Sequence, residues 1–313
     1  MSFEYRGILP AMQLPFEQDL SIDEAELRRL ATWLAGHKGI GGLVTNGHTG
    51  EVFALTAELR AKATRIVADE VKGKLPVVSG ICCEGISEAL EQAQMAREAG
   101  ASALLVMPPH QWLRFGMKQP DNVVDYFAAI GKGSGLDLVV HIYPAWTRAS
   151  YNSDTLAALA KLPWVKCMKV GTRDMNKYAR DLRIIRAADP NVTLLTCHDE
   201  YLLASMVQGV DGALVGFASF IPQTIIDLYA AVCDGDLKRA MAIQDRINPL
   251  KDVVYGGGEP TGDAHARMKM AMYLAGILKS PTVQPPTQLP AGAELQAIKA
   301  AVRNAGMMRR EAA

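Results

Sequence analysis

The sequence of 313 residues has no excess of charge of either sign, because 33 lysines and arginines balance 33 aspartates and glutamates. Proteins that bind nucleic acid present a basic face, and a balanced composition provides no such field. The chain also lacks any apolar run approaching the ~20 residues that span a bilayer. We therefore expect the partner to be a small molecule, and neither nucleic acid nor a membrane.

Features of exported proteins are missing as well. The cysteines number five, an odd count that does not suit a disulfide framework. The N-terminal sequence MSFEYRGILPAM has neither the charged start nor the long apolar stretch of a secretory signal peptide. These observations predict a cytoplasmic protein.

Short apolar runs rich in β-branched residues alternate with amphipathic helical patterns over about the first 220 residues. The runs are nearly continuous, as expected for strands that are covered on both faces. Eight strand–helix alternations predict an α/β fold of the (β/α)8, or TIM-barrel, type. An open doubly wound sheet is the alternative, but no GxGxxG motif follows the first strand. The predicted strands are Gly7–Met12, Gly41–Thr45, Leu75–Gly80, Ala103–Met107, Leu138–Tyr143, Trp164–Lys169, Thr193–Cys197 and Gly212–Gly216.

The pattern after Pro222 is helical only. We interpret residues 1–225 as the barrel that carries the active site and residues 226–313 as a C-terminal helical extension. The first of the late helices is expected to close the barrel, and a proline-rich turn precedes the last one. Helices are predicted between the strands at Ser21–Gly36, Thr56–Val71, Ser87–Ala99, Asp174–Ala188 and Glu200–Gln208, and after them at Thr224–Asp234, Leu237–Val254, Ala264–Lys279 and Glu294–Asn304.

Lys169 ends the sixth predicted strand, and active sites of such barrels lie at the C-terminal strand ends. Because side chains alternate along a strand, Val165, Cys167 and Lys169 should share one face, which would be the barrel interior. An apolar cavity lowers the pKa of an amine from ~10.4 toward neutrality. A neutral amine can attack a ketone and form a Schiff base. The alternative from these residues alone is a lysine paired with a carboxylate such as Asp199.

Two more strand ends carry candidate residues. Tyr143 ends the fifth strand, beside Lys169, where its phenol could shuttle protons. A core tyrosine with a satisfied hydroxyl is the alternative. Gly216 ends the eighth strand and is a candidate for contact with the substrate.

The loop after the second strand reads Gly47-His48-Thr49-Gly50-Glu51. Its backbone N–H groups and the Thr49 hydroxyl would suit a substrate carboxylate, with the glycines permitting close approach. An ordinary turn from strand to helix is the alternative, in which Glu51 caps or orients the loop and does not touch the substrate.

These motifs together resemble the dihydrodipicolinate synthase / N-acetylneuraminate lyase superfamily of class I aldolases. The resemblance spans nearly the whole chain, through GILPAMQLPF, GASALLVMPP, VKCMKVGTRD and GVDGALVGFASFIP. It implies that Lys169 forms a Schiff base with a small 2-oxo acid such as pyruvate and that Tyr143 shuttles protons. It also implies that Gly47, His48 and Thr49 bind the carboxylate, that no metal or other cofactor is needed, and that the chain forms a homo-oligomer, either a dimer or a tetramer.

Several positions depart from the family pattern. His48 replaces the first hydroxyl residue of the usual GTTGE or GSTGE loop, and His110-Gln111 replace a tyrosine pair that follows the fourth strand in dihydrodipicolinate synthases. Arg148 stands where those synthases carry an arginine for the carboxylate of the aldehyde substrate, but the usual YNxP has become Tyr143-Pro144-Ala145-Trp146. We keep Arg148 as a candidate substrate-binding residue. We expect His48, His110, Trp112 and His141 to line the pocket.

The departures favour a lyase other than the lysine-biosynthesis synthase, one that cleaves, condenses or dehydrates a hydroxy-2-oxo acid. The remaining family alternatives are 4-hydroxy-tetrahydrodipicolinate synthase and a hydroxypyrroline-carboxylate deaminase. A metal-dependent barrel aldolase is a further alternative, because His48, His110, His141 and His198 fall at strand ends, although no HxH or HExxH spacing occurs. A non-catalytic 2-oxo acid binding protein is the last, since a fold does not guarantee activity.

Overall fold

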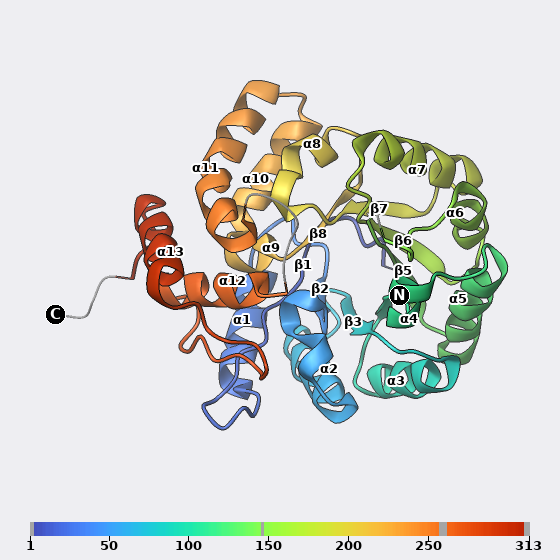
Figure 1. Ribbon diagram of the computed structural model, residues 1–313, viewed down its shortest axis with the longest axis horizontal. Coiled ribbons are helices and arrows are strands. Elements are labelled where there is room, and N and C mark those ends of the chain that lie inside the picture. Colours follow the sequence, from blue (N-terminus) through green and yellow to red (C-terminus); the bar gives the residue numbers. More distant parts are fainter. Residues whose placement is uncertain (1–2, 145–146, 257–261, 310–313) are drawn as a thin grey trace.

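The computed structural model describes residues 3–144, 147–256 and 262–309. Its eight parallel strands form one sheet in the order β1-β8-β7-β6-β5-β4-β3-β2. The sheet closes where β1 and β2 meet, through the parallel bridges Ile8↔Ile40 and Ala11↔Val44. The predicted TIM barrel is confirmed (Figure 1). The strands are β1 Gly7–Pro10, β2 Leu43–Thr45, β3 Val77–Ile81, β4 Ala103–Val106, β5 Asp137–Ile142, β6 Val165–Val170, β7 Thr193–Thr196 and β8 Gly212–Val215.

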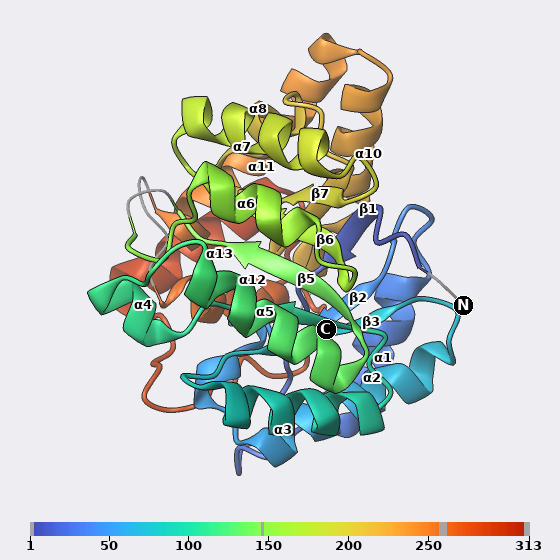
Figure 2. The ribbon, with the colours of Figure 1, turned by 90° about the vertical axis from the view of Figure 1, so that its right-hand side faces the viewer.

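Helices surround the strands, and Figure 2 shows α3, α5, α6 and α7 side by side over one flank of the barrel. Side-chain caps start several of them: Thr56 accepts from the N–H of Leu59, and Asn152 from that of Thr155. None of the described helices combines the length and apolarity needed to cross a membrane. The outer helices are α1 Glu24–Ala35, α2 Ala57–Val71, α3 Ile86–Glu98, α5 Asp121–Ser134, α6 Ser153–Ala160, α7 Met175–Ala188, α8 Leu202–Met206 and α10 Pro222–Cys233.

Short helical turns follow the strands at the C-terminal end of the barrel, where the chain reverses toward the next outer helix. Among those described, they are η1 His48–Gly50, η2 Val52–Ala54, α4 His110–Phe115, η3 Asp199–Tyr201 and α9 Phe217–Phe220.

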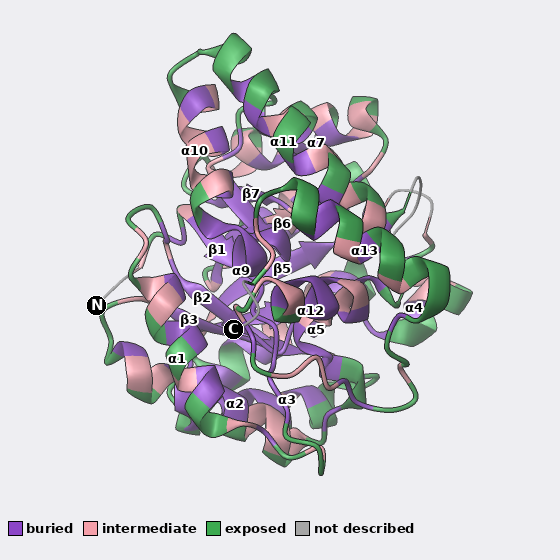
Figure 3. Ribbon diagram, turned by 90° about the vertical axis from the view of Figure 1, so that its left-hand side faces the viewer, coloured by how far each residue is buried: buried purple, intermediate pink, exposed green. Residues whose placement is uncertain are grey.

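The strands separate two apolar cores. Alternate strand residues, including Val139, Cys167 and Leu195, fill the barrel interior, and the others pack against the helices. Figure 3 shows the strands buried and the outer faces of the helices exposed. The prediction that Val165 shares the face of Cys167 was wrong. The register of β5 and β6 shifts at Leu138/Val139, a β-bulge that leaves Val165 in the outer core.

The C-terminal extension consists of α11 (Leu237–Tyr255), α12 (Ala264–Leu274) and α13 (Gly292–Asn304), which pack on one another. Helix α12 also contacts η1 and α9 at the barrel mouth. Helix α10 runs continuously across residue 225, where the sequence put the boundary of the barrel. Helix α12 ends before the predicted Lys279, because Gly276 adopts a φ of 73° that turns the chain out of the helix.

Gly41 lies where β1 and β2 close the barrel, and its N–H donates to the carbonyl of Ile8 at 2.9 Å. A Cβ on Gly41 would lie 1.7 Å from the carbonyl oxygen of Arg6, a backbone atom that cannot rotate away. We expect Gly41→Ala to lower the free energy of unfolding by about 1–3 kcal/mol or more in urea titrations. In the control Gly36→Ala, the new Cβ would lie 3.4 Å from Trp33 O, so stability should be unchanged or slightly higher. Equal losses in the two variants would contradict the steric argument.

Candidate active site

A cavity of about 760 Å³ opens at the C-terminal ends of the strands. The sequence-predicted residues Lys169, Tyr143, Gly47–Thr49 and Gly216 all line it. They come from β6, the end of β5, the turn after β2 and the end of β8, four elements far apart in the sequence. The cavity has the size of a small-molecule site.

Lys169 points into this cavity because it alternates with Cys167, which lies in the barrel interior. Its side chain is partly exposed, and its strand neighbour in the register is His141. Burial lowers the pKa of Lys169, although Cys197 and Asp199 act in the opposite direction. In the described part of the chain Lys169 forms no ion pair, so the pairing with Asp199 considered from the sequence is not formed.

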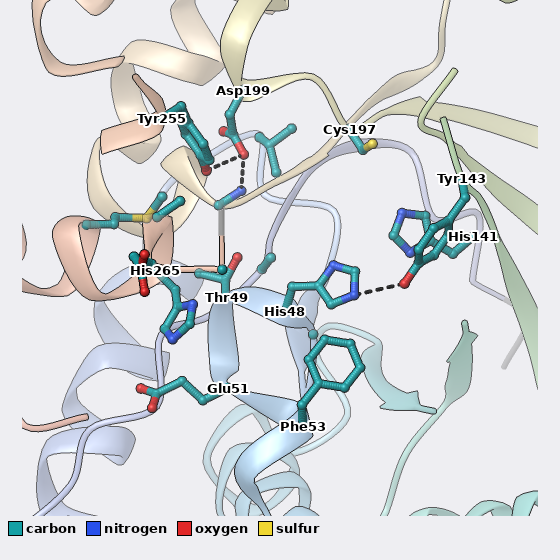
Figure 4. Close-up of a pocket in the computed structure, with 18 of the residues that line it drawn as sticks. His48, Thr49, Glu51, Phe53, His141, Tyr143, Cys197, Asp199, Tyr255 and His265 are labelled. Carbon is teal, nitrogen blue, oxygen red and sulfur yellow. Dashed lines mark hydrogen bonds between the residues drawn. The ribbon is translucent and has the colours of Figure 1, made fainter. Parts of the chain in front are cut away.

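Tyr143 lies within hydrogen-bonding distance of His48, with 3.0 Å between the phenol oxygen and Nε2 (Figure 4). Burial, together with Lys169, lowers the pKa of His48 to about 3, and burial raises the pKa of Tyr143. Both groups are therefore uncharged near neutral pH, and the imidazole tautomer decides which of them donates in this hydrogen bond. The ring of His141 lies 4.7 Å from that of Tyr143, centroid to centroid, and completes a neutral aromatic wall.

Asn46 stabilises the turn from β2 into η1, and no sequence motif marked it as a candidate. Asn46 has a positive φ of 56°, and its Nδ2 donates to the carbonyl of Arg60 and to the hydroxyls of Thr64 and Ser79. The next residues, Gly47–Thr49, line the cavity. The strained Asn46 thus fixes the direction in which this loop leaves the strand.

Glu51 lines the cavity, but its carboxylate is turned away from His48 and Tyr143. Its carboxylate is 1% exposed and pairs with Lys269 of α12. This agrees with the alternative in which Glu51 orients the loop. Lys269 was missed because a lysine inside a helical pattern reads as a solvated position.

A second carboxylate, Asp199, lies at the opposite side of the cavity and was considered only as a partner for Lys169. Its two oxygens accept from the backbone N–H groups of Gly216 and Phe217, each at 2.9 Å, and from the Tyr255 hydroxyl at 2.8 Å (Figure 4). Gly216 lines the cavity, but its N–H already donates to Asp199 and is not free to bind a substrate. Tyr255 belongs to the extension, which no local motif connected with the site.

Arg148 lies outside the cavity. Its side chain is exposed, and its Nη1 donates to the carbonyl of Arg114 in α4 at 2.8 Å. The prediction that Arg148 binds the substrate is not supported by this placement, because the guanidinium turns toward α4. Ala145 and Trp146, which alter this loop relative to the family pattern, lie outside the described residues.

The expectation that four aromatic or imidazole side chains line the pocket holds for His48 and His141 and was wrong for His110 and Trp112. His110 is exposed on the outer side of Phe53, with 4.8 Å between the ring centroids. Trp112 is buried against Tyr126. Both belong to the short helix α4, and neither lines the cavity.

The four histidines at strand ends do not converge. His198 packs between Tyr178 and Tyr201, with ring centroids 5.1 and 4.9 Å away. Within residues 3–144, 147–256 and 262–309, no group of three or more histidine, cysteine, aspartate or glutamate side chains is arranged to hold a metal ion. Activity in the presence of a chelator tests the metal-dependent alternative.

The fold and the cavity define a barrel enzyme with a lysine that opens into the cavity at its mouth. A profile of the Dihydrodipicolinate synthetase family matches residues 4–305, and the chain belongs to this family. The 4-hydroxy-tetrahydrodipicolinate synthase of Rhodopseudomonas palustris (strain BisA53) is 29% identical over 306 residues, which cover 97% of this chain and 98% of that protein. The N-acetylneuraminate lyase of Escherichia coli (strain SMS-3-5 / SECEC) is 26% identical over 286 residues, 91% of this chain and 92% of that protein.

Among solved structures, YagE, a prophage protein of the dihydrodipicolinic acid synthase family from E. coli K12 in complex with pyruvate, superposes with a TM-score of 0.86. The match covers 96% of this chain and 99% of that one, and at 23% identity it supports the fold alone. The family predicted from the motifs is confirmed. The chain is an enzyme, a lyase of the class I aldolase type.

Burial raises the pKa of Asp199 to about 6, against the hydrogen bonds from Phe217, Gly216 and Tyr255. A folded-state pKa above the ordinary value of 3.8 means that the stability due to protonated Asp199 is fully present below about pH 4 and lost as pH rises through about 6. In Asp199→Asn this dependence disappears. We expect the difference in unfolding free energy between wild type and variant to change by on the order of 2 kcal/mol between about pH 4 and 7. Urea titrations at both pH values measure it, and a constant difference would contradict it.

Proposed function

We propose that this enzyme forms a Schiff base between Lys169 and a small 2-oxo acid, and that it cleaves, condenses or dehydrates a hydroxy-2-oxo acid. The observation that carries the proposal is the Lys169 amine, which has a lowered pKa and opens into a cavity of about 760 Å³. The Tyr143 phenol and the Gly47–Thr49 loop line the same cavity. Imine chemistry on a 2-oxo acid requires an amine, a proton donor and a loop that can bind the carboxylate.

The reaction begins when the substrate carboxylate docks on Gly47–Thr49, at the start of η1, which places the adjacent ketone near Lys169. The neutral amine adds to the carbonyl carbon. One proton then moves from nitrogen to the former carbonyl oxygen, and a second joins the leaving hydroxyl, so that water departs and a protonated imine remains. Tyr143 carries these protons, and its hydrogen bond to His48 orients the phenol.

The protonated imine draws electrons from the neighbouring bond. In an aldolase, the carbon–carbon bond breaks, its electron pair enters the imine to give an enamine, and the released hydroxyl loses its proton as an aldehyde forms. In a dehydratase, a proton leaves the carbon next to the imine, and a hydroxyl then departs as water. Both routes use the same Lys169 adduct, and neither requires a metal ion or an organic cofactor.

Two family alternatives keep the same imine and differ in the second half of the reaction. A 4-hydroxy-tetrahydrodipicolinate synthase is favoured by the relative that is 29% identical. Against it stand the exposed side chain of Arg148 and the absence of a tyrosine at position 110 or 111. A hydroxypyrroline-carboxylate deaminase is the other. A substrate panel separates them, because the synthase needs an aldehyde as second substrate and the deaminase turns over a hydroxypyrroline carboxylate alone.

We further propose a homo-oligomer, a dimer or tetramer, that acts in the cytoplasm on a small molecule, without nucleic acid or membrane as partner. The family resemblance supports the assembly. Sedimentation velocity at catalytic concentrations measures it.

The first test is reductive trapping. Wild-type protein incubated with pyruvate and borohydride should gain the mass of one reduced pyruvate adduct per chain, mapped to the peptide that contains Lys169. Lys169→Ala should gain none, since the amine is lost. Lys166→Ala is the matched control, because Lys166 is exposed on the same strand and should leave the adduct unchanged. An adduct at another lysine would refute the assignment.

The second test follows the pH. The rate of adduct formation depends on the neutral fraction of Lys169, so it should rise with pH and level off at a lower pH than the ordinary lysine pKa of ~10.4. A plateau reached only above that value would show an amine without the lowered pKa. Trapping and turnover of 4-hydroxy-2-oxo acids should both survive a chelator, whereas a metal-dependent aldolase would lose activity. Trapping without turnover of any substrate would favour a binding protein.

A further inference from the structure

Lys269 and Glu51 form an ion pair that is cut off from water, with side chains 0% and 1% exposed. Taking two opposite charges out of water is costly, and apolar side chains of similar size are often as good for stability. A buried pair in this position, one helical turn from the cavity-lining His265, therefore points to a role in geometry.

The ammonium of Lys269 joins three segments of the chain. Its Nζ donates to the carbonyl of Leu14 at 2.8 Å, to the carbonyl of Thr282 at 3.0 Å, and to Glu51. It also lies 4.5 Å from the centroid of the Phe16 ring. All three hydrogens are used, so the nitrogen is fixed relative to the turn after β1, the turn after β2 and the proline-rich segment of the extension.

Glu51 fixes the end of the substrate loop from the other side. It adopts the left-handed conformation, with φ 59° and ψ 34°, directly after η1, a conformation that costs energy in a residue other than glycine. One of its carboxylate oxygens accepts from Lys269, and the other accepts from the backbone N–H of Gln284 at 2.7 Å. The side chain of Gln284 in turn donates to the carbonyl of Leu20 at 2.8 Å.

The segments that this pair connects are two walls of the same cavity. Gly47–Thr49 line one part of it, and Pro285, Pro286 and Thr287, which directly follow Gln284, line another. Figure 4 shows Glu51 below Thr49, turned away from His48 and Tyr143. The distance between loop and wall thus depends on the contacts of Glu51 and Lys269.

We propose that Lys269 is a positioning residue for the carboxylate-binding loop. Through Glu51 it holds Gly47–Thr49 in the geometry that binds the 2-oxo acid and sets the spacing to the wall at residues 285–287. The inference rests on the proposed function, because it assumes that the loop binds the substrate. It assigns Lys269 to substrate affinity and leaves the imine chemistry at Lys169 unchanged.

The test is the double variant Glu51→Gln/Lys269→Met, which removes both charges and leaves neither buried alone. Trapping by borohydride is measured as a function of pyruvate concentration, with the unfolding midpoint recorded in parallel. The half-saturating pyruvate concentration should rise about tenfold, or about 1.4 kcal/mol, while the trapping rate at saturation stays within about twofold. Glu51→Gln alone, which keeps an oxygen acceptor for Lys269, should raise it less, and it carries the test if the double variant does not fold.

The matched control is Glu26→Gln. Glu26 is also 1% exposed and ion-paired, to Arg29 and Lys279, but lies on α1 away from the cavity. It should change stability and leave the half-saturating concentration unaltered. An unchanged concentration in the double variant, or an effect confined to the rate at saturation, would overturn the positioning role. Failure of wild-type protein to form any adduct at Lys169 would instead refute the proposed function, so the two failures are distinguishable.

Discussion

The closure of eight parallel strands into a barrel is the constraint on which the rest of the structure depends. In a closed barrel the side chain of each strand residue points either inward or outward, and the two directions alternate along a regular strand. Along β6 the inward positions are Cys167 and then Lys169, so the same alternation that fills the lower barrel with apolar atoms delivers an amine to its mouth. Lys169 is the next inward position after Cys167, so the strand geometry that builds the core also places this amine in the cavity.

Burial acts on three kinds of group at once. It lowers the pKa of the Lys169 amine, lowers that of the His48 imidazole and raises that of the Tyr143 phenol. Each shift favours the uncharged form, and uncharged amine, imidazole and phenol are the states in which a nucleophile and a proton shuttle can work together. Removal from water is the largest cause of all three shifts, and the charge of Lys169 adds to it at His48.

The C-terminal extension shares in the site. Tyr255 donates a hydrogen bond to Asp199, and the cavity is lined in part by His265 and residues 285–287. The Glu51–Lys269 pair joins the extension to the loop after β2. The barrel supplies Lys169, and the extension supplies part of the cavity wall. A division of the chain at residue 225 cuts through α10 and separates residues that line one cavity.

The sequence by itself determined the barrel, the eight strand positions to within a few residues, and the candidates Lys169, Tyr143 and Gly47–Thr49, because strand periodicity and strand-end motifs are local. It misplaced Val165, since a β-bulge leaves no mark in a continuous apolar run. It also placed His110 and Trp112 in the cavity, which neither of them lines, and gave Arg148 as a substrate-binding candidate, although its guanidinium donates to Arg114 of α4 outside the cavity. Only the tertiary structure decided that His48 meets Tyr143 and that Lys269 reaches Glu51, 218 residues earlier. Such contacts depend on where distant segments pack. The packing of the whole core sets those positions, and the immediate sequence neighbours of a residue do not.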